Sequence, residues 1–502
     1  MNTSKNRSNV IVALMLIMMV SSLAFGQGAP GGQAPPTTKG AVIKGKAPVS
    51  KEILKVKLPR AEEATLPNGL RVVLLRSDKV PTFNMQMVFL SGGLSDKPDY
   101  RGLANFTAAL VREGTKTRSS KDIAEQVDAL GATLTANSGL SSMTSVVSTG
   151  GLVENLDQTM ALFSDVIRNP IFPQEEVEKY KTRTLAQLQF QRSIPQFLAQ
   201  ERFNQAIYGT SHPASLVAPP TESIKRLSTK DLADFHATYY RPNNAILAIV
   251  GDVTLKDIMP RIEKAFGDWA KGDVPAANIP AAPAQGEAKI YLIDRPGSVQ
   301  TVIQLGTLGI ERISPDYFAV LMANRVLGGG PSGRLFLNLR EDKGYTYGAY
   351  SNFGGSKFKG TWGASSEVRT DVTEGAMKEF MYELNRMRND KVQGEELENA
   401  KRAIIGSFAL SLEEPQSLLQ NIITQKLYNL PADYWDTYPQ KVAAITAEDI
   451  QRVAQKYIDL GHLQVVAVGD AAKAREILSK YGKVEVFDAE GKPVGQPPSQ
   501  NK

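Results

Sequence analysis

The order of apolar and polar positions along the chain predicts strands and helices that follow one another in uneven runs. Leu66-Pro-Asn-Gly69 is a turn signal, and the apolar-rich segments 70–76 and 83–91 that follow it are typical of strands. Residues 102–113 predict a helix, and a serine-capped segment that ends at Gly131 predicts another. Because strands and helices do not alternate regularly, the pattern favours an α+β fold over a doubly wound parallel sheet.

The second part of the chain repeats the first. The segment 227–232 (Leu-Ser-Thr-Lys-Asp-Leu) returns at 445–450 as Ile-Thr-Ala-Glu-Asp-Ile, an offset of 218 residues (445 − 227), and Tyr239 recurs at the same offset as Tyr457. Each block predicts a helix capped by Ser or Thr, followed by an apolar strand, 245–250 or 463–468. A single period of this length, present twice, indicates duplicated domains rather than a solenoid.

Composition changes mark the boundaries of these domains. Prolines at 275, 280 and 283 cannot lie within a helix or a central strand, so they mark a linker. We predict a signal peptide over 1–26, a disordered spacer over 27–50, domains over 51–272 and 288–488, a linker over 273–287 and a disordered tail over 489–502.

The N-terminus has the layout of a secretory signal. Lys5 and Arg7 precede the apolar run 10–20, and Ala24-Phe25-Gly26 is a small-x-small cleavage site. We therefore expect an exported protein, periplasmic or secreted, with no membrane span once the signal is cleaved. An uncleaved anchor is the alternative, although the apolar run is short for a span. The chain has no Cys, which excludes a lipoprotein anchor and disulfide bonds.

Charge and composition narrow the range of partners. The chain is 42% apolar and 22% charged, as in ordinary globular proteins, and its formal net charge is +6. This charge is small for 502 residues, and no stripe of basic residues with interleaved aromatics is present. We therefore expect no nucleic-acid partner.

The most informative motif is Gly102-Leu-Ala-Asn-Phe-Thr-Ala-Ala-Leu-Val-Arg-Glu-Gly-Thr115. It resembles the first active-site helix of the insulinase, pitrilysin and mitochondrial processing peptidase family, whose zinc peptidases carry the motif His-x-x-Glu-His. The resemblance places the two metal histidines at Asn105 and Ala109, and the general base at Ala108. Positions i, i+3 and i+4 share one helix face, so one face has lost two imidazoles and a carboxylate.

No other set of residues replaces these ligands. A catalytic zinc needs about three protein ligands from Cys, His or carboxylates. The chain has only His212, His236 and His462, and no two of them have the spacing of a helical pair. The family's third ligand, a Glu, falls on Gln187, or on Ala186 if the register slips by one. We therefore expect no zinc on this chain and no peptide hydrolysis by the chain alone.

A second motif of the family is retained in the other half. The segment 326–347 contains a Gly-rich turn, then Ser-x-Arg-Leu-Phe, then Arg340 and Tyr347 seven residues apart. In active relatives this Arg and Tyr contact the substrate near the scissile bond, and a guanidinium fork and a phenol are suited to binding carbonyl or oxyanion oxygens. The alternative is an ordinary surface Arg and a core Tyr. Thr135-Ala136-Asn137-Ser138 occupies the place of the family's substrate-binding edge strand.

The resemblance implies two homologous α+β domains, each a mixed, mainly antiparallel sheet with helices on one side, facing each other as a clamshell. It also implies a division of labour, because some family members pair a metal-bearing chain with one that lacks the metal motif. We therefore expect a non-catalytic subunit of an exported heteromeric zinc endopeptidase. Its partners would be a zinc-bearing paralogue and a peptide or unfolded polypeptide substrate. The alternative is a peptide-binding or scaffold protein of the cell envelope with no role in proteolysis.

Overall fold

The computed structural model describes residues 52–494, and the chain folds into two halves that each contain a six-stranded mixed sheet. The predicted signal peptide and spacer lie outside the described residues. In sheet order, the first half has β1 (Glu62–Thr65), β2 (Arg71–Arg76), β6 (Ala245–Gly251), β3 (Thr82–Phe89), β5 (Ser145–Leu152) and β4 (Thr133–Ser138). The second has β12 (Val484–Phe487), β7 (Lys289–Asp294), β11 (Gln464–Gly469), β8 (Gln300–Leu308), β10 (Lys359–Arg369) and β9 (Thr346–Gly355).

The helices follow the same order in both halves. The first half contains α2 (Leu103–Leu110), α3 (Ser120–Ala129), α4 (Leu156–Arg168), α5 (Gln174–Gln191), α6 (Pro195–Tyr208), α7 (Thr221–Arg226), α8 (Thr229–Tyr239) and α9 (Leu255–Phe266). The second contains α10 (Tyr317–Leu327), α11 (Arg334–Phe336), the π-helical turn η6 (Leu337–Asp342), α12 (Thr373–Asn389), α13 (Gly394–Ser411), α14 (Pro415–Leu427), α15 (Tyr438–Ala443), α16 (Ala447–Tyr457) and α17 (Ala471–Ser479). Apart from their outermost strands β1 and β12, the sheets match strand for strand, which confirms the predicted α+β fold and duplication.

The repeated sequence blocks form equivalent elements. Ser228 and Thr446 begin α8 and α16 with the same capping box, in which the hydroxyl accepts the N–H of the acid three residues later. Each of these helices is followed by the fully buried strand β6 or β11. Pairing is parallel between β2 and β6 and between β7 and its neighbours β11 and β12, and antiparallel elsewhere, so both sheets are mixed.

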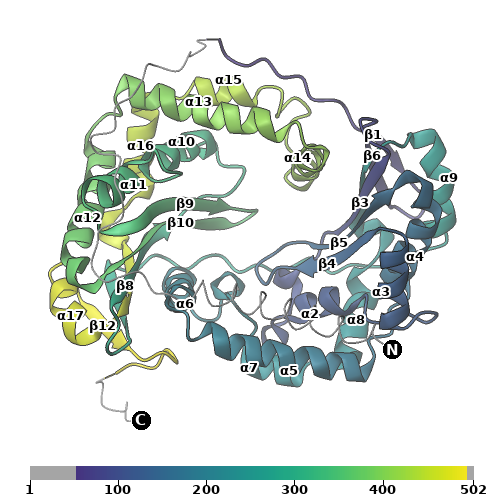
Figure 1. Ribbon diagram of the computed structural model, residues 1–502, viewed down its shortest axis with the longest axis horizontal. Helices are drawn as coiled ribbons and strands as arrows, with labels where there is room; N and C mark the ends of the chain where they lie inside the picture. Colours follow the sequence, from purple (N-terminus) through teal and green to yellow (C-terminus); the bar gives the residue numbers. More distant parts are fainter. Residues whose placement is uncertain (1–51, 495–502) are drawn as a thin grey trace, which may run out of the picture.

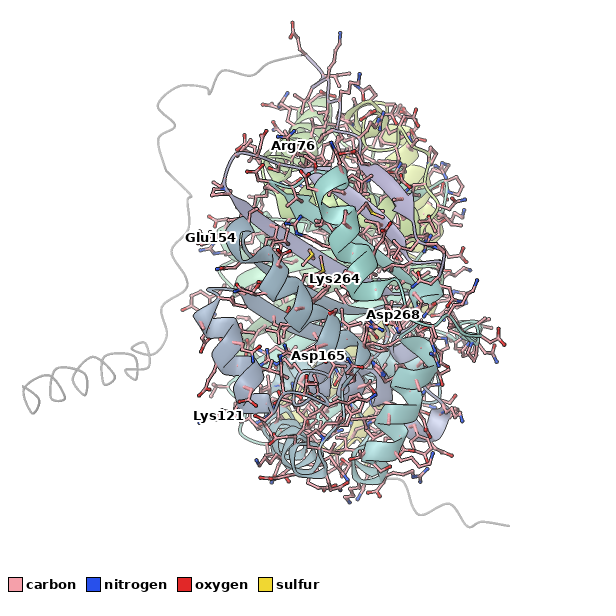
Figure 2. All side chains as sticks on the ribbon, turned by 90° about the vertical axis from the view of Figure 1, so that its right-hand side faces the viewer. Arg76, Lys121, Glu154, Asp165, Lys264 and Asp268 are labelled. Carbon is pink, nitrogen blue, oxygen red and sulfur yellow. The ribbon has the colours of Figure 1, made fainter. Side chains whose placement is uncertain are left out.

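Alternating residues along the strands divide each sheet between two cores. In the first half, Met85 and Met87 of β3 pack with that half's own helices, whereas Val88 lies in a different cluster on the opposite face. Lys121, Asp165 and Lys264 mark α3, α4 and α9 on the outer side of this sheet (Figure 2). Own-half helices on one side of the sheet are what the family resemblance implies.

The inner face of each sheet is covered by a helix from the other half. Leu419, Ile422 and Ile423 of α14 pack on the first sheet, and in exchange α6 packs on the second sheet against Val466 and Val468. Figure 1 shows the halves opposite each other, with α14 reaching the first sheet and α6 lying below the second. The pattern of apolar and polar residues did not predict this exchange.

The segments at the domain borders make defined contacts. Residues 270–286 contain no helix or strand, and the carbonyl of Pro280 lies 2.9 Å from His212 Nε2. Residues 489–494, predicted as the start of a disordered tail, instead turn back along β12, where Val494 N–H donates to Val486 O at 2.8 Å. Within residues 52–494 there is no helix long and apolar enough to cross a membrane.

Candidate functional site

Helix α2 carries the positions at which the family's metal ligands would stand, and here one of them supports the fold. The Asn105 side chain donates from Nδ2 to the carbonyl of Ser138, the last residue of β4, at 2.8 Å. Ala108 is fully buried and Ala109 is half-buried. The helix starts at Gly102, whose φ of +98° favours glycine, and Asp96 accepts the N–H groups of Gly102 and Ala104. This face of the helix therefore presents one amide, already used, and two methyl groups.

Helix α5 lies against α2 without supplying a metal ligand. The Phe106 ring of α2 packs edge-on against Tyr180 of α5, with centroids 4.7 Å apart. Gln187 and Ala186, at the place of the family's third ligand, are exposed. In the described part of the chain no three His, Cys, Asp or Glu side chains cluster in a way that could hold a metal ion. The side chains present therefore do not fit a zinc ion.

The three histidines are held by other groups. His236 Nε2 lies 2.7 Å from the carbonyl of Ile167, and His462 Nδ1 lies 2.7 Å from Asp459. His212 accepts the N–H of Ala214 at Nδ1. Burial lowers the pKa of His236 to about 4, so this imidazole is neutral at physiological pH. All three histidines act as caps or packing groups.

The Gly-Thr pair that closes the first motif anchors the end of α2. The Thr115 hydroxyl donates to Asp165 at 2.7 Å, and Arg118 forms an ion pair with the same carboxylate at 2.6 Å. Asp165 is a buried residue of α4 and is labelled in Figure 2. Family residues around the lost ligands have thus kept a structural role.

Arg340 lies in η6 on the path between α11 and β9. Its guanidinium carbon sits 4.7 Å from the centre of the Phe336 ring, and Nη1 is 3.7 Å from Glu341, too long for a hydrogen bond. Nε is buried and has no hydrogen-bond partner within the described residues. The guanidinium is therefore supported from below by an aromatic ring and retains unused donors.

Tyr347 is the second residue of the edge strand β9 and is 70% exposed. Its hydroxyl has no hydrogen-bond partner in the part of the chain that the structure describes. Tyr350, further along the strand, is 43% exposed and packs on Phe336 at 5.5 Å, the same ring on which Arg340 stacks. The Phe336 ring thus contacts both Arg340 and Tyr350, and Tyr347 is exposed rather than a core residue.

The glycine-rich turn is held by Arg325, a residue that the sequence motifs did not indicate. Arg325 donates to the carbonyl of Gly329 at 2.5 Å and to Ser332 at 3.1 Å. Gly330 has φ of +155°, and a Cβ there would collide with the Arg325 guanidinium. Arg334, the Arg of Ser-x-Arg-Leu-Phe, is buried in a bidentate pair with Glu396. These contacts hold the turn and give it a structural role.

The edge strand named by the resemblance is present in the first sheet. Within residues 52–494, β4 pairs with β5 and with no other strand, although Asn105 and Arg112 donate to the backbone carbonyls of Ser138 and Leu134 in β4. Its last residue, Ser138, is the one that Asn105 holds. A free edge can bind an extended peptide through its backbone, whatever the side chains.

The duplicated α+β halves, the motif helix and the Arg/Tyr segment define a metallopeptidase-like class of protein. Comparison with protein families agrees. Residues 71–220 match the family described as insulinase (peptidase family M16), and residues 226–404 match the peptidase M16 inactive domain. The chain belongs to the M16 family.

The individual relatives are distant in sequence, but the alignments cover most of both chains. A peptidase M16 inactive domain from Pseudomonas fluorescens shares 27% identity with a TM-score of 0.75, covering 82% of this chain and 98% of that one. A protease from Helicobacter pylori, at 21% identity and a TM-score of 0.76, covers 82% and 100% and has the same fold. An uncharacterized zinc protease of Streptomyces coelicolor is 25% identical over 401 residues, 78% of this chain and 86% of its own length.

Proposed function

We propose that this chain is the non-catalytic subunit of an exported heteromeric zinc endopeptidase. In this proposal Arg340 and Tyr347 complete an active site whose zinc is held by a partner chain, a paralogue with an intact His-x-x-Glu-His motif. The substrate is a peptide or an unfolded polypeptide. The observation that carries the proposal is the contrast between the two motifs. The Asn105 side chain is hydrogen-bonded to the carbonyl of Ser138, whereas Tyr347 is 70% exposed and its hydroxyl has no hydrogen-bond partner among the described residues.

The chemistry of the Arg/Tyr pair supports this role. A guanidinium is always charged and offers a planar fork to carbonyl or carboxylate oxygens. Stacking on Phe336 restricts the Arg340 side chain, so less conformational entropy is lost when it binds an oxygen. The Tyr347 phenol can donate to an oxygen on which charge develops as the peptide bond is attacked. Neither group needs a metal on its own chain.

The test is peptide cleavage by the full-length chain assembled with its co-purified zinc-bearing partner. Tyr347→Phe removes only the hydroxyl, and Arg340→Lys keeps the charge but removes the fork. Each variant is expected to lower kcat on the order of 10², or about 3 kcal/mol, the usual cost of one oxyanion donor. Tyr382→Phe is the matched control, because Tyr382 is also exposed, at 55%, but lies on α12.

Complex formation must be followed in parallel by size-exclusion chromatography, so that lost activity is not confused with lost assembly. Wild-type turnover by both variants within an intact complex would overturn the proposal. The chain would then be a scaffold.

A further inference from the structure

The strand that carries Tyr347 contains a β-bulge at that residue. Along the β9–β10 ladder, Thr346 pairs with Val368 and Ala349 pairs with Ser366. Two residues, Tyr347 and Gly348, therefore stand opposite the single residue Glu367. In a regular strand, residues three positions apart point to opposite faces of the sheet. The extra residue of a bulge places them on the same face and so changes the direction of the side chains. As a result Tyr347 and Tyr350 are both exposed, whereas Thr346 and Ala349 are both buried.

Two buried hydroxyl groups form hydrogen bonds with three backbone groups at the bulge. The Thr346 hydroxyl donates to Glu367 O at 2.6 Å and accepts the N–H of Gly348 at 3.1 Å. The Ser366 hydroxyl, across the ladder, donates to Gly348 O at 2.9 Å. In this arrangement the hydrogen of each hydroxyl group and that of the Gly348 amide each form one hydrogen bond. Thr346 and Ser366 are only 5% and 6% exposed, so water does not compete readily for these bonds.

The extra residue in the bulge also serves the aromatic support of Arg340. A Cβ at Gly348 would meet the Tyr350 ring at 2.6 Å, so the missing side chain lets that ring lie back along the strand. In this position Tyr350 packs on Phe336, whose ring supports Arg340. The bulge therefore sets the direction of Tyr347 and leaves space for the aromatic stack beneath Arg340.

We infer that Thr346 and Ser366 are positioning residues for Tyr347, an inference that rests on the proposed function. Neither hydroxyl is exposed enough to touch a substrate. Their role is to hold the Tyr347–Gly348 bulge so that the phenol is presented to the substrate in one direction. Without them the strand can return to regular pairing, which would turn Tyr347 to another direction.

The first experiment is a double-mutant cycle in the complex with the zinc-bearing partner. Thr346→Val and Ser366→Ala are each expected to lower kcat by about tenfold with little change in KM, which is less than the loss of about 10² from removing the phenol. In a Tyr347→Phe background the same changes should have no further effect, because the group they position is gone. Thr346→Ser, which keeps the hydroxyl, should restore kcat. Ser365→Ala, the same change on the exposed side of β10, should leave it unchanged.

The second experiment needs no partner. Hydrogen–deuterium exchange of the free chain, followed by mass spectrometry over residues 345–349, reports whether the bulge is held. Thr346→Val should speed exchange of the Gly348 amide by roughly fivefold, the factor that corresponds to one lost hydrogen bond. Ser365→Ala should not.

The outcomes separate this inference from the proposed function. If Tyr347→Phe is slow but Thr346→Val and Ser366→Ala turn over normally, the positioning role is wrong and the proposed function stands. An equal loss of kcat in both Tyr347 backgrounds would mark Thr346 as merely structural and would also overturn the inference. If Tyr347→Phe itself is fully active, the proposed function and the catalytic role of the bulge both fail, and exchange still decides whether the hydroxyls hold it.

Discussion

At the scale of single residues, Asn105 shows how a lost ligand position can acquire a structural role. Its amide ties the motif helix to the last residue of β4 through a hydrogen bond of 2.8 Å. A hydrogen bond of this kind contributes about 1 kcal/mol to stability. Ala108, where the resemblance places the family's general base, presents a buried methyl group on the same helix.

Restoring the two histidines is therefore expected to give no peptidase. The variant Asn105→His/Ala109→His lacks the general base at Ala108 and a third ligand at Gln187, and loss of a general base alone typically costs about 10² to 10⁴ in rate. Cleavage of a fluorogenic peptide and zinc content by elemental analysis are the measurements. Asn105→Ala, measured by chemical denaturation, gives the cost of the lost amide bond. Zinc-dependent cleavage by the double variant alone would show that the metal positions have been assigned wrongly.

At the scale of elements, the ends of the helices depend on contacts of different range. α3, α8 and α16 begin with capping boxes formed within four residues, so their starts are readable from sequence. α2 has no such side-chain cap, and the distant Asp96 accepts its first N–H groups. Burial raises the pKa of Asp96 to about 7 despite these donors and Arg101.

Asp96 and His236 are each expected to make the stability of the fold depend on pH, in opposite directions. The pKa of His236 is lowered from 6.5 to about 4, so between these values the unfolded chain binds more protons and stability is lost as pH falls. The pKa of Asp96 is raised from 3.8 to about 7, so the folded state binds more protons and stability is lost as pH rises. In the shared window, pH about 4 to 6.5, the two slopes oppose each other.

Single variants separate the two slopes. Relative to wild type, His236→Phe should become less stable as pH rises through this window, and Asp96→Asn should become more stable. Each difference can reach about 1.4 kcal/mol per pH unit, the effect of one proton. The measurement is chemical denaturation at several pH values. Parallel curves for wild type and both variants would contradict the assignment.

At the scale of the whole molecule, the exchange of α6 and α14 joins the two halves. Each sheet would expose part of its apolar inner face if the other half were removed, because the helix that crosses over packs on that face. Surface ion pairs such as Glu63–Lys426 add contacts between the halves, though exposed pairs contribute little. We therefore expect the halves to unfold together.

Leu419→Ala tests this coupling. Leu419 is fully buried on α14 against the first sheet, and a Leu→Ala change at such a site costs about 2 to 5 kcal/mol. The expected result is a lower melting temperature for both halves. The measurements are calorimetry and proteolysis of each half. Leu410→Ala on α13, where the side chain is 69% exposed, is the matched control and should change little. Destabilisation confined to the first half would show that the halves fold independently.

The sequence by itself determined the α+β class and the duplication, and the family resemblance placed the metal-ligand positions on Asn105 and Ala109 and the Arg/Tyr segment on Arg340 and Tyr347. These features depend on local periodicity, on caps within four residues and on residue identity, all of which are visible without a fold. The predicted helix 102–113 is shorter in the structure, α2 ending at Leu110, because residues 111–118 turn to place Thr115 on Asp165.

Only the tertiary structure decided what each side chain faces. An amphipathic helix shows that it must cover an apolar surface but not which one, so the crossing of α6 and α14 could not be read from their sequences. The bond from Asn105 to Ser138 and the bond from Ser366 to Gly348 join residues 33 and 18 positions apart, beyond the reach of local pattern. Whether Tyr347 is exposed or buried depends on a bulge, because one extra residue reverses the side-chain alternation of a strand.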